Sequence, residues 1–198
     1  MRQLILLSMI GLSFCLSISA HAATYSGGSG TVVNPYQIAN KADLLTLAAD
    51  NTNYDKCFIL TADIDLEGQV FTMAVIAPVD TDNPTYYDFF TGIFDGNGHK
   101  ITNFMIAGEN TRYLALFGYI GLGGQIKNLG VDNCTIGGTT GSGCIGGLAG
   151  LNDGSISNCS ATGVIGSSSD FYVGGLIGLN EGTVYHCYAA GEVFGDFN

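Results

Sequence analysis

The hydrophobic positions of this chain change their spacing near residue 57. Before it, residues 41–50, KADLLTLAAD, place their leucines and alanines on one face of a helix, with Asn40 as the cap and Asp43 at the capping-box position. After it, short apolar runs rich in β-branched and aromatic residues alternate with turns of Gly, Asn and Asp. The pattern predicts one amphipathic helix followed by many short β-strands.

The second half of the chain repeats itself. GGLAGLNDGSISNCSATG, residues 146–163, is followed by GGLIGLNEGTVYHCYAAG, residues 174–191, at a spacing of 28. Apolar positions recur with a similar period over a wider window, namely Leu116, Leu148 and Leu176, and then Ile126, Ile156 and Val184. A repeat of this kind indicates one structural unit stacked on the next rather than a single active site.

Repeats with several short strands and glycine turns are typical of a solenoid whose coils pair in parallel, about 4.8 Å apart, so that matched side chains stack. We predict an all-β fold, a right-handed parallel β-helix (β-solenoid) with a short N-terminal capping helix. A β-propeller is the alternative, although its blades would need longer strands. The expected structural repeat positions are Gly147, Leu148, Gly150, Asn152, Gly154, Cys159, Gly163, Gly175, Leu176, Gly178, Asn180, Gly182, Cys187 and Gly191.

The domain organisation follows from the same pattern. We expect a flexible lead-in over residues 23–33 and a solenoid domain over 34–198, with the capping helix at 41–50, irregular coils over 57–143 and regular repeats over 144–198. The last residues, GEVFGDFN, begin a further coil without a capping element. We therefore expect the chain to be truncated at its C-terminus and to be part of a longer protein.

Residues 1–22 combine a basic residue, an apolar run and the small-residue cleavage pattern Ala-His-Ala. These features predict a signal peptide cleaved before Ala23, a secreted or cell-surface location, and no membrane insertion after cleavage. A lipoprotein anchored at Cys15 is an alternative that the bulky Phe14 disfavours, and a retained membrane anchor is disfavoured by the cleavage pattern.

Charge narrows the range of partners. Without Arg2, which belongs to the predicted signal peptide, the chain has five Lys and Arg residues against 17 Asp and Glu residues. An acidic surface of this kind repels nucleic acid, so we expect no nucleic-acid partner.

Five cysteines follow the predicted signal peptide, which is an odd number for an exported chain. The chain contains no CxxC motif, so its cysteines do not indicate a zinc site. If the repeats stack in register, Cys159 and Cys187 come close enough for a disulfide, but in-register side chains run parallel and fit its dihedral angle poorly. We favour buried thiols at these two positions, with the disulfide as the alternative.

Catalytic candidates are few. Asp63, Asp65 and Asp95 could supply the two carboxylates that glycoside hydrolysis requires, about 5 to 10 Å apart. His99 follows a DGNG turn, which is typical of a solvated strand start, and His186 takes the place of an asparagine one repeat earlier. No HExxH motif is present. We expect no catalytic residues in this chain.

The segments TADIDLEG and FDGNGH offer oxygen ligands of the kind that calcium prefers. Neither matches an EF-hand loop or a calcium-binding nonapeptide, and Asp or Asn beside Gly is what tight turns use. We therefore expect no cofactor and no metal site, with Ca²⁺ as the alternative.

The two repeated segments resemble the GLUG repeat, named for its Gly-Leu-apolar-Gly core. NPYQIANKADLLTLAAD, FILTADIDLEG and GIFDGNGHKITNF are similar to the leader that precedes such repeats in secreted and surface bacterial proteins. GLUG repeats also occur in IgA-cleaving metallopeptidases and adhesin-like proteins, where they are not the catalytic part. One departure is Ser160, where the repeat favours an aromatic residue such as Tyr188.

The resemblance implies a noncatalytic module of a secreted or cell-surface protein, serving as a structural spacer or as an adhesion and binding platform. Its partner would be a glycan or a host or cell-surface protein. The alternative is a polysaccharide-active β-helix, a hydrolase or lyase, that uses clustered Asp carboxylates. Exposed aromatic contacts for a partner could come from Tyr86, Tyr87, Tyr172, Tyr185 and Tyr188.

Overall fold

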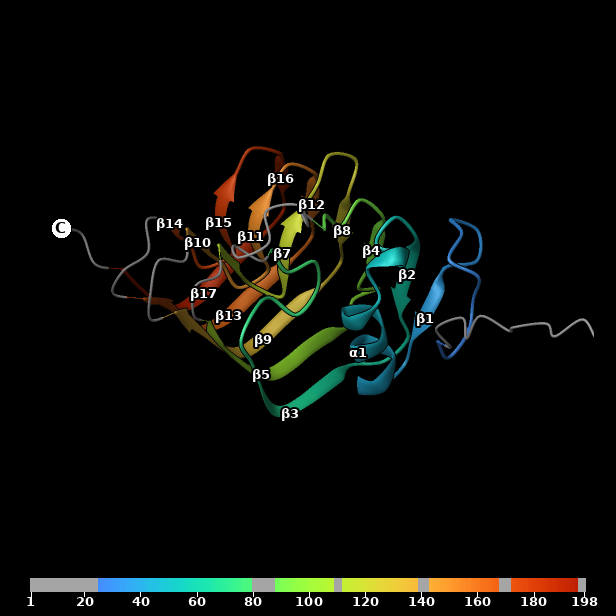
Figure 1. The fold of residues 1–198 in the computed structure, drawn as a ribbon, viewed down its shortest axis with the longest axis horizontal. Helices are drawn as coiled ribbons and strands as arrows, with labels where there is room; N and C mark the ends of the chain where they lie inside the picture. The colour runs from blue at the N-terminus through green and yellow to red at the C-terminus, as the bar shows by residue number, and fades with distance from the viewer. Residues whose placement is uncertain (1–24, 80–87, 109–111, 139–142, 168–171, 196–198) are drawn as a thin grey trace, which may run out of the picture.

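The computed structural model describes residues 25–79, 88–108, 112–138, 143–167 and 172–195. Within these ranges the chain is a stack of β-coils with one α-helix near its N-terminal end (Figure 1). The all-β solenoid with a short N-terminal helix is therefore confirmed. The predicted signal peptide, residues 1–22, falls outside the described residues and stays a prediction. No helix within the described ranges has the length and apolar character needed to cross a membrane.

Four parallel sheets run along the stack. The first contains β1 (Tyr36–Ile38), β2 (Cys57–Leu60), β4 (Ile93–Asp95), β8 (Gln125–Lys127), β12 (Ser155–Ser157) and β16 (Thr183–Tyr185). The second contains β3 (Ile64–Phe71), β5 (Lys100–Gly108), β9 (Gly130–Gly138), β13 (Ser160–Ser167) and β17 (Tyr188–Gly195). Two shorter sheets contain β6 (Tyr113–Leu114), β10 (Cys144–Ile145) and β14 (Tyr172–Val173), and then β7 (Phe117–Ile120), β11 (Ala149–Asn152) and β15 (Ile177–Asn180).

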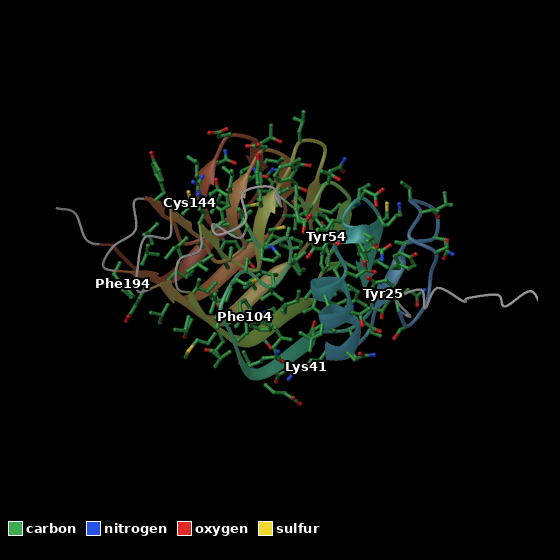
Figure 2. All side chains as sticks on the ribbon, in the orientation of Figure 1. Tyr25, Lys41, Tyr54, Phe104, Cys144 and Phe194 are labelled. Carbon is green, nitrogen blue, oxygen red and sulfur yellow. The ribbon has the colours of Figure 1, made fainter. Side chains whose placement is uncertain are left out.

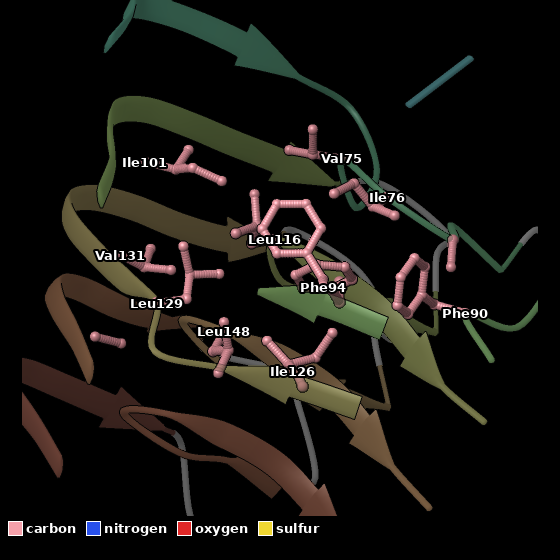
Figure 3. Packing of buried hydrophobic residues seen from close by; sticks show 14 of the residues in the cluster. Val75, Ile76, Phe90, Phe94, Ile101, Leu116, Ile126, Leu129, Val131 and Leu148 are labelled. Carbon is pink, nitrogen blue, oxygen red and sulfur yellow. The ribbon is translucent and has the colours of Figure 1, made fainter. Parts of the chain in front are cut away.

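Each of the last three coils visits the four sheets in the same order, so neighbours in a sheet come from successive coils. Apolar residues that match in register therefore form ladders inside the stack (Figure 3). Ile126 pairs with Phe94 on one side and Ile156 on the other, and all three side chains are fully buried. Leu148, also fully buried, donates its backbone N–H to the carbonyl oxygen of Leu176 at 2.9 Å. This burial of aligned apolar side chains is the main favourable contribution to folding.

The helix α1 (Lys41–Ala49) is one residue shorter than expected, because a 3-10 turn, η1 (Asn51–Asn53), follows it. The Asn40 side chain caps it by accepting a hydrogen bond from the backbone N–H of Asp43 at 3.0 Å. The Asp43 carboxylate accepts from Ala39 N–H at 2.9 Å rather than from the cap residue itself. Helix α1 packs against β1 and β3, and its Leu44 and Leu47 are fully buried.

The segment expected to be a flexible lead-in is packed from residue 25 onward. Gly27 forms an antiparallel bridge with Gln37 in β1, and the ring of Tyr25 lies 4.5 Å from that of Tyr36. Aromatic packing and the backbone bridge hold this segment against the first coil. Together with α1, it covers much of the N-terminal end of the stack (Figure 1).

Candidate functional site

An open groove with a volume of about 390 Å³ lies on the outer face of β3, β5 and β9. We call it the corner groove; its lining residues are Asp65, Glu67, Gly68, Asn103, Phe104, Met105, Asn133 and Thr135. It is bounded by side chains from three successive coils, and Figure 2 shows Phe104 and Lys41 close to this region. Among these residues the sequence had singled out Asp65 as a candidate catalytic carboxylate, and residues 65–68 as part of the candidate calcium segment TADIDLEG.

The groove forms where the long strands bend. Asn103 in β5 and Asn133 in β9 both have left-handed backbone conformations, with φ of 59° and 52°. Asparagine tolerates this region better than most residues. The left-handed residue interrupts the alternation of inward-facing and outward-facing side chains along the strand. As a result, Ile101 and Phe104, which are three positions apart, both face the core. The segments ITNFMI, residues 101–106, and VDNCTI, residues 131–136, carry this signal at a spacing of 30.

Hydrogen bonds connect the polar side chains along the groove. The Asn133 amide donates to Asn103 Oδ1 at 2.6 Å, and the backbone N–H of Glu67 donates to Asp65 Oδ1 at 2.7 Å. The Glu67 N–H, followed by the Asn103 side chain, lowers the pKa of the Asp65 carboxyl. Lys41 from α1 pairs with Glu67 at 3.0 Å. The groove thus offers amide and carboxylate groups beside Met105, which is 40% exposed.

The other two candidate carboxylates lie outside the groove lining. Asp63 Oδ1 is 3.0 Å from His99 Nδ1 and accepts the backbone N–H of Lys100 at 3.1 Å. The hydrogen bond with His99, then that with Lys100, lowers the pKa of the Asp63 carboxyl. His99 therefore has a partner that its sequence pattern did not predict.

Asp95 is held by its own set of partners. Burial alone would raise the pKa of its carboxyl, but hydrogen bonds from Asn128, Asn97 and Lys127 outweigh burial and lower it. Glycoside hydrolysis needs one carboxyl with a raised pKa to act as the general acid. Asp63, Asp65 and Asp95 all have the opposite shift, and each serves a local turn or ladder.

The segments TADIDLEG and FDGNGH are the candidate calcium ligands of this chain. Among the described residues, no group of three or more His, Cys, Asp or Glu side chains is arranged to hold a metal ion. Two of their carboxylates accept hydrogen bonds within turns, namely Asp65 Oδ1 from Glu67 N–H at 2.7 Å and Asp95 Oδ1 from Asn97 N–H at 2.8 Å.

His186 lies at a turn between β16 and β17, with φ of 52°. Asn158, one coil earlier, has the same φ of 52°, and its side chain donates to Asn128 Oδ1 at 3.1 Å. His186 therefore occupies a turn position that asparagine fills in the inner coils. This placement agrees with its interpretation as an ordinary repeat position.

Cys57, Cys134, Cys159 and Cys187 are free thiols in the described part of the chain. Cys159 and Cys187 stack on adjacent coils, with the Cys159 N–H 3.4 Å from the Cys187 sulfur. Burial raises the pKa of the Cys159 thiol to about 12 and that of Cys134 to about 11. Cys187 is only partly buried.

The repeated glycines bring successive coils close together. A methyl group on Gly154 would collide with the carbonyl oxygen of Gly124, and one on Gly182 with that of Gly154 itself. Gly163 and Gly191 have φ of 151° and 132°, a region that disfavours side chains. Asn152 and Asn180 pair in register, and the Asn152 amide donates to Asn180 Oδ1 at 2.7 Å. These repeat positions therefore serve coil stacking.

Three of the five candidate tyrosines lie on the last described coil. Tyr172, Tyr185 and Tyr188 are 53%, 52% and 64% exposed. Tyr86 and Tyr87 fall outside the described residues.

The stacked coils and their ladders define a β-solenoid repeat protein. A family model of the GLUG motif matches residues 141–166 and 169–193, which are the coils that contain β11 to β13 and β15 to β17. These two coils of the chain are therefore GLUG repeats.

Two curated relatives are similar over most of this chain. Halomucin of Haloquadratum walsbyi is 32% identical over 154 residues, which are 74% of this chain and 2% of halomucin. A protein of Evansella cellulosilytica, described as a Gly-rich membrane protein, is 35% identical over 153 residues, which are 71% of this chain and 16% of that protein. The chain thus spans a small part of the length of either relative.

A solved structure has a similar fold. It is a crystal structure from Bacteroides ovatus, described as an immunoglobulin A1 protease, with a TM-score of 0.57 and 21% sequence identity. The match covers 86% of this chain and 61% of that one. At this identity the likeness concerns the fold alone.

Proposed function

We propose that this chain is a noncatalytic repeat module of a secreted or cell-surface protein, acting as a rigid spacer that also offers a binding platform. The observation that carries the proposal is the use of the repeat positions, because the matched residues pack coil on coil. Ile126, Ile156 and Val184 continue one ladder, and Asn152 bonds to Asn180. A stack built in this way holds its two ends at a fixed separation.

The placement of the carboxylates supports a noncatalytic role over the polysaccharide-active alternative. A glycoside hydrolase would bring an acid of raised pKa and a second carboxylate to opposite sides of one bond. The corner groove contains Asp65 and Glu67, but the pKa of Asp65 is lowered and Glu67 pairs with Lys41.

The relatives support the location. One is named halomucin, and the other is described as a Gly-rich membrane protein. Both names are consistent with a location at the cell surface. The predicted signal peptide points the same way. We place this chain outside the cytoplasm on these grounds.

For the platform, the corner groove is the surface we assign to a glycan or surface-protein partner. Its amide and carboxylate groups can form hydrogen bonds with hydroxyl groups, while Met105 supplies an apolar contact. Its open shape suits an extended ligand better than an enclosed small molecule.

The test combines a turnover assay with a binding assay on purified protein. Neutral and acidic polysaccharides are incubated with the chain and assayed for new reducing ends and for unsaturated products. A glycan array and immobilised cell-surface proteins report binding. We expect no turnover, and binding that Met105→Lys weakens.

Val164→Lys is the matched control, because Val164 faces outward on the same sheet and is 36% exposed but lies outside the groove lining. Release of reducing ends that Asp65→Asn abolishes would overturn the noncatalytic proposal. Binding that both lysine variants weaken equally would contradict the groove assignment and leave the spacer role standing.

A further inference from the structure

The corner groove contains two rows of side chains that run along the axis of the stack. In one row, Asn103 of β5 lies beside Asn133 of β9, and the two amides are joined by the hydrogen bond of 2.6 Å. In the other row, Met105 of β5 pairs in register with Thr135 of β9. Strands of neighbouring coils are about 4.8 Å apart. Each row therefore offers one side chain per coil, and the groove crosses the strands rather than following them.

Irregularities of strand pairing set the length of the groove. Opposite Asp132 and Asn133 of β9, the next strand, β13, has a single residue, Thr162. The row of asparagines therefore stops at β9. At the other end, β3 has three residues, 66–68, opposite Asn103 of β5, and two of these three residues line the groove. The groove thus spans three coils, those of β3, β5 and β9.

The lining carries negative charge without an unpaired cation. Asp65 and Glu67 are acidic, and the described lining residues include no Lys or Arg. Lys41 lies nearby, but it is paired with Glu67 at 3.0 Å. Hydrogen bonds from the Glu67 N–H and then from the Asn103 side chain lower the pKa of the Asp65 carboxyl, which is therefore ionised at neutral pH. An acidic polysaccharide would meet electrostatic repulsion in this groove.

Cations elsewhere on the chain do not change this balance. The other three lysines each form a salt bridge, in the pairs Lys56–Asp55, Lys100–Asp132 and Lys127–Asp95. Arg112 precedes β6, which belongs to a different sheet from the groove. In the described part of the chain, every lysine thus has an acidic partner already.

The chemistry of the lining favours a glycan over a protein partner. The amides of Asn103 and Asn133 and the hydroxyl of Thr135 can each donate and accept hydrogen bonds, as sugar hydroxyl groups also do. Protein interfaces instead depend on aromatic residues and arginines as anchors. The one aromatic residue of the described lining, Phe104, is only 2% exposed. Met105, which is 40% exposed, gives the carbon face of a sugar ring an apolar surface to pack against.

We infer that the platform of the proposed function, on which this inference rests, takes a neutral glycan chain that lies along the stack axis with one sugar on each of three coils. A sugar ring in an extended chain is about as long as the spacing between coils, so consecutive sugars meet equivalent side chains. Hydroxyl groups of the glycan bond to the row of Asn103 and Asn133, and ring faces pack beside Met105.

A glycan array with neutral and acidic members tests the charge of the ligand, and calorimetry with oligomers of the bound glycans tests its length. We expect the bound members to be neutral. Affinity should rise from two sugars to three and stay level at four and five, because the groove spans three coils.

Asn133→Gly tests the asparagine row, because glycine removes the amide and still adopts the φ of 52° found there. We expect the affinity for the neutral trisaccharide to fall about fivefold. Asn158→Gly is the matched control. Asn158 has the same φ of 52° and donates a similar hydrogen bond to Asn128 at 3.1 Å, but it lies outside the groove lining. The control should leave the affinity unchanged.

Circular dichroism establishes that each variant is folded. Should Asn133→Gly disturb β9, Thr135→Val removes a hydroxyl group from the same strand with little change of shape, and it should lower the affinity by a smaller factor.

The possible outcomes separate this inference from the proposed function. Bound glycans that are mainly acidic, affinity that keeps rising beyond three sugars, or equal losses in the two glycine variants would overturn the inference and leave the binding platform standing. Binding of cell-surface proteins alone would do the same. A chain that binds no glycan and no protein would overturn the platform as well, so that only the spacer role would remain.

Discussion

Leu148→Ala provides the most direct test of coil stacking, with Leu176→Ala as its matched partner. The two leucines occupy the same position of the repeat, and Leu148 N–H bonds to the Leu176 carbonyl oxygen at 2.9 Å. They differ in surroundings, because Leu148 is fully buried between coils, whereas Leu176 is partly buried. The same chemical change should therefore have two different costs.

The cost at Leu148 has two parts. Removing three carbons from the core loses about 2 kcal/mol of transfer free energy. A residual cavity of about 60 Å³ adds about 1.5 kcal/mol. We expect Leu148→Ala to lower the free energy of unfolding by about 3 to 4 kcal/mol. At Leu176 the site opens towards solvent, so no closed cavity forms, and we expect a loss of about 1 to 2 kcal/mol.

The assay is urea unfolding followed by circular dichroism, at a concentration low enough for the chain to be monomeric. With a slope of about 2 kcal/mol per molar urea, the two midpoints should differ by about 1 M. Equal midpoints, or a larger loss at Leu176, would refute the argument that the inner ladder is buried by the coils on both sides.

Three further predictions concern other parts of the stack. Gly154→Ala should destabilise the fold by about 1 to 3 kcal/mol or more, since its methyl group would collide with the neighbouring coil. Gly143→Ala should be nearly neutral, because the atom nearest to its methyl group would be 3.5 Å away. Thermal melts compare the two variants, and equal melting temperatures would contradict close coil packing at Gly154. In native alkylation followed by mass spectrometry, Cys187 should react before Cys159, because burial raises the pKa of the Cys159 thiol to about 12; equal rates would argue against the burial of Cys159. Asp95→Asn should lower the free energy of unfolding at pH 7, because the pKa of the Asp95 carboxyl is lowered in the folded chain. The difference in stability from wild type should fade as the pH drops below about 4 and through that lowered pKa. A difference in stability that persists at pH 2 would contradict an electrostatic origin.

Some of the candidate site could be predicted from the sequence and some could not. The repeat aligned Asn152 with Asn180, because identical residues recur in identical turns. The corner groove was missed, because its residues come from coils whose sequences have diverged. Asn103 and Asn133 are brought together by strand pairing, and their left-handed conformations depend on the bend that each coil makes there.

The carboxylates show the same division. Asp63, Asp65 and Asp95 were grouped by residue type, because the stacking of coils could bring them together. The structure gives each one separate partners, such as His99 for Asp63 and Lys127 for Asp95. Contacts of this kind join residues more than 30 positions apart and depend on which coils are neighbours, so residue spacing alone could not assign them.

By itself, the sequence determined the class of fold, because periodic leucines, isoleucines and glycines between short strands favour an arrangement in which equal positions stack. It also determined the capping helix, through the local pairing of Asn40 with Asp43. Only the tertiary structure decided how far the stack extends into the diverged coils and where the strands bend. Those features depend on backbone pairing between distant segments, and backbone pairing is the same whatever side chains the segments carry.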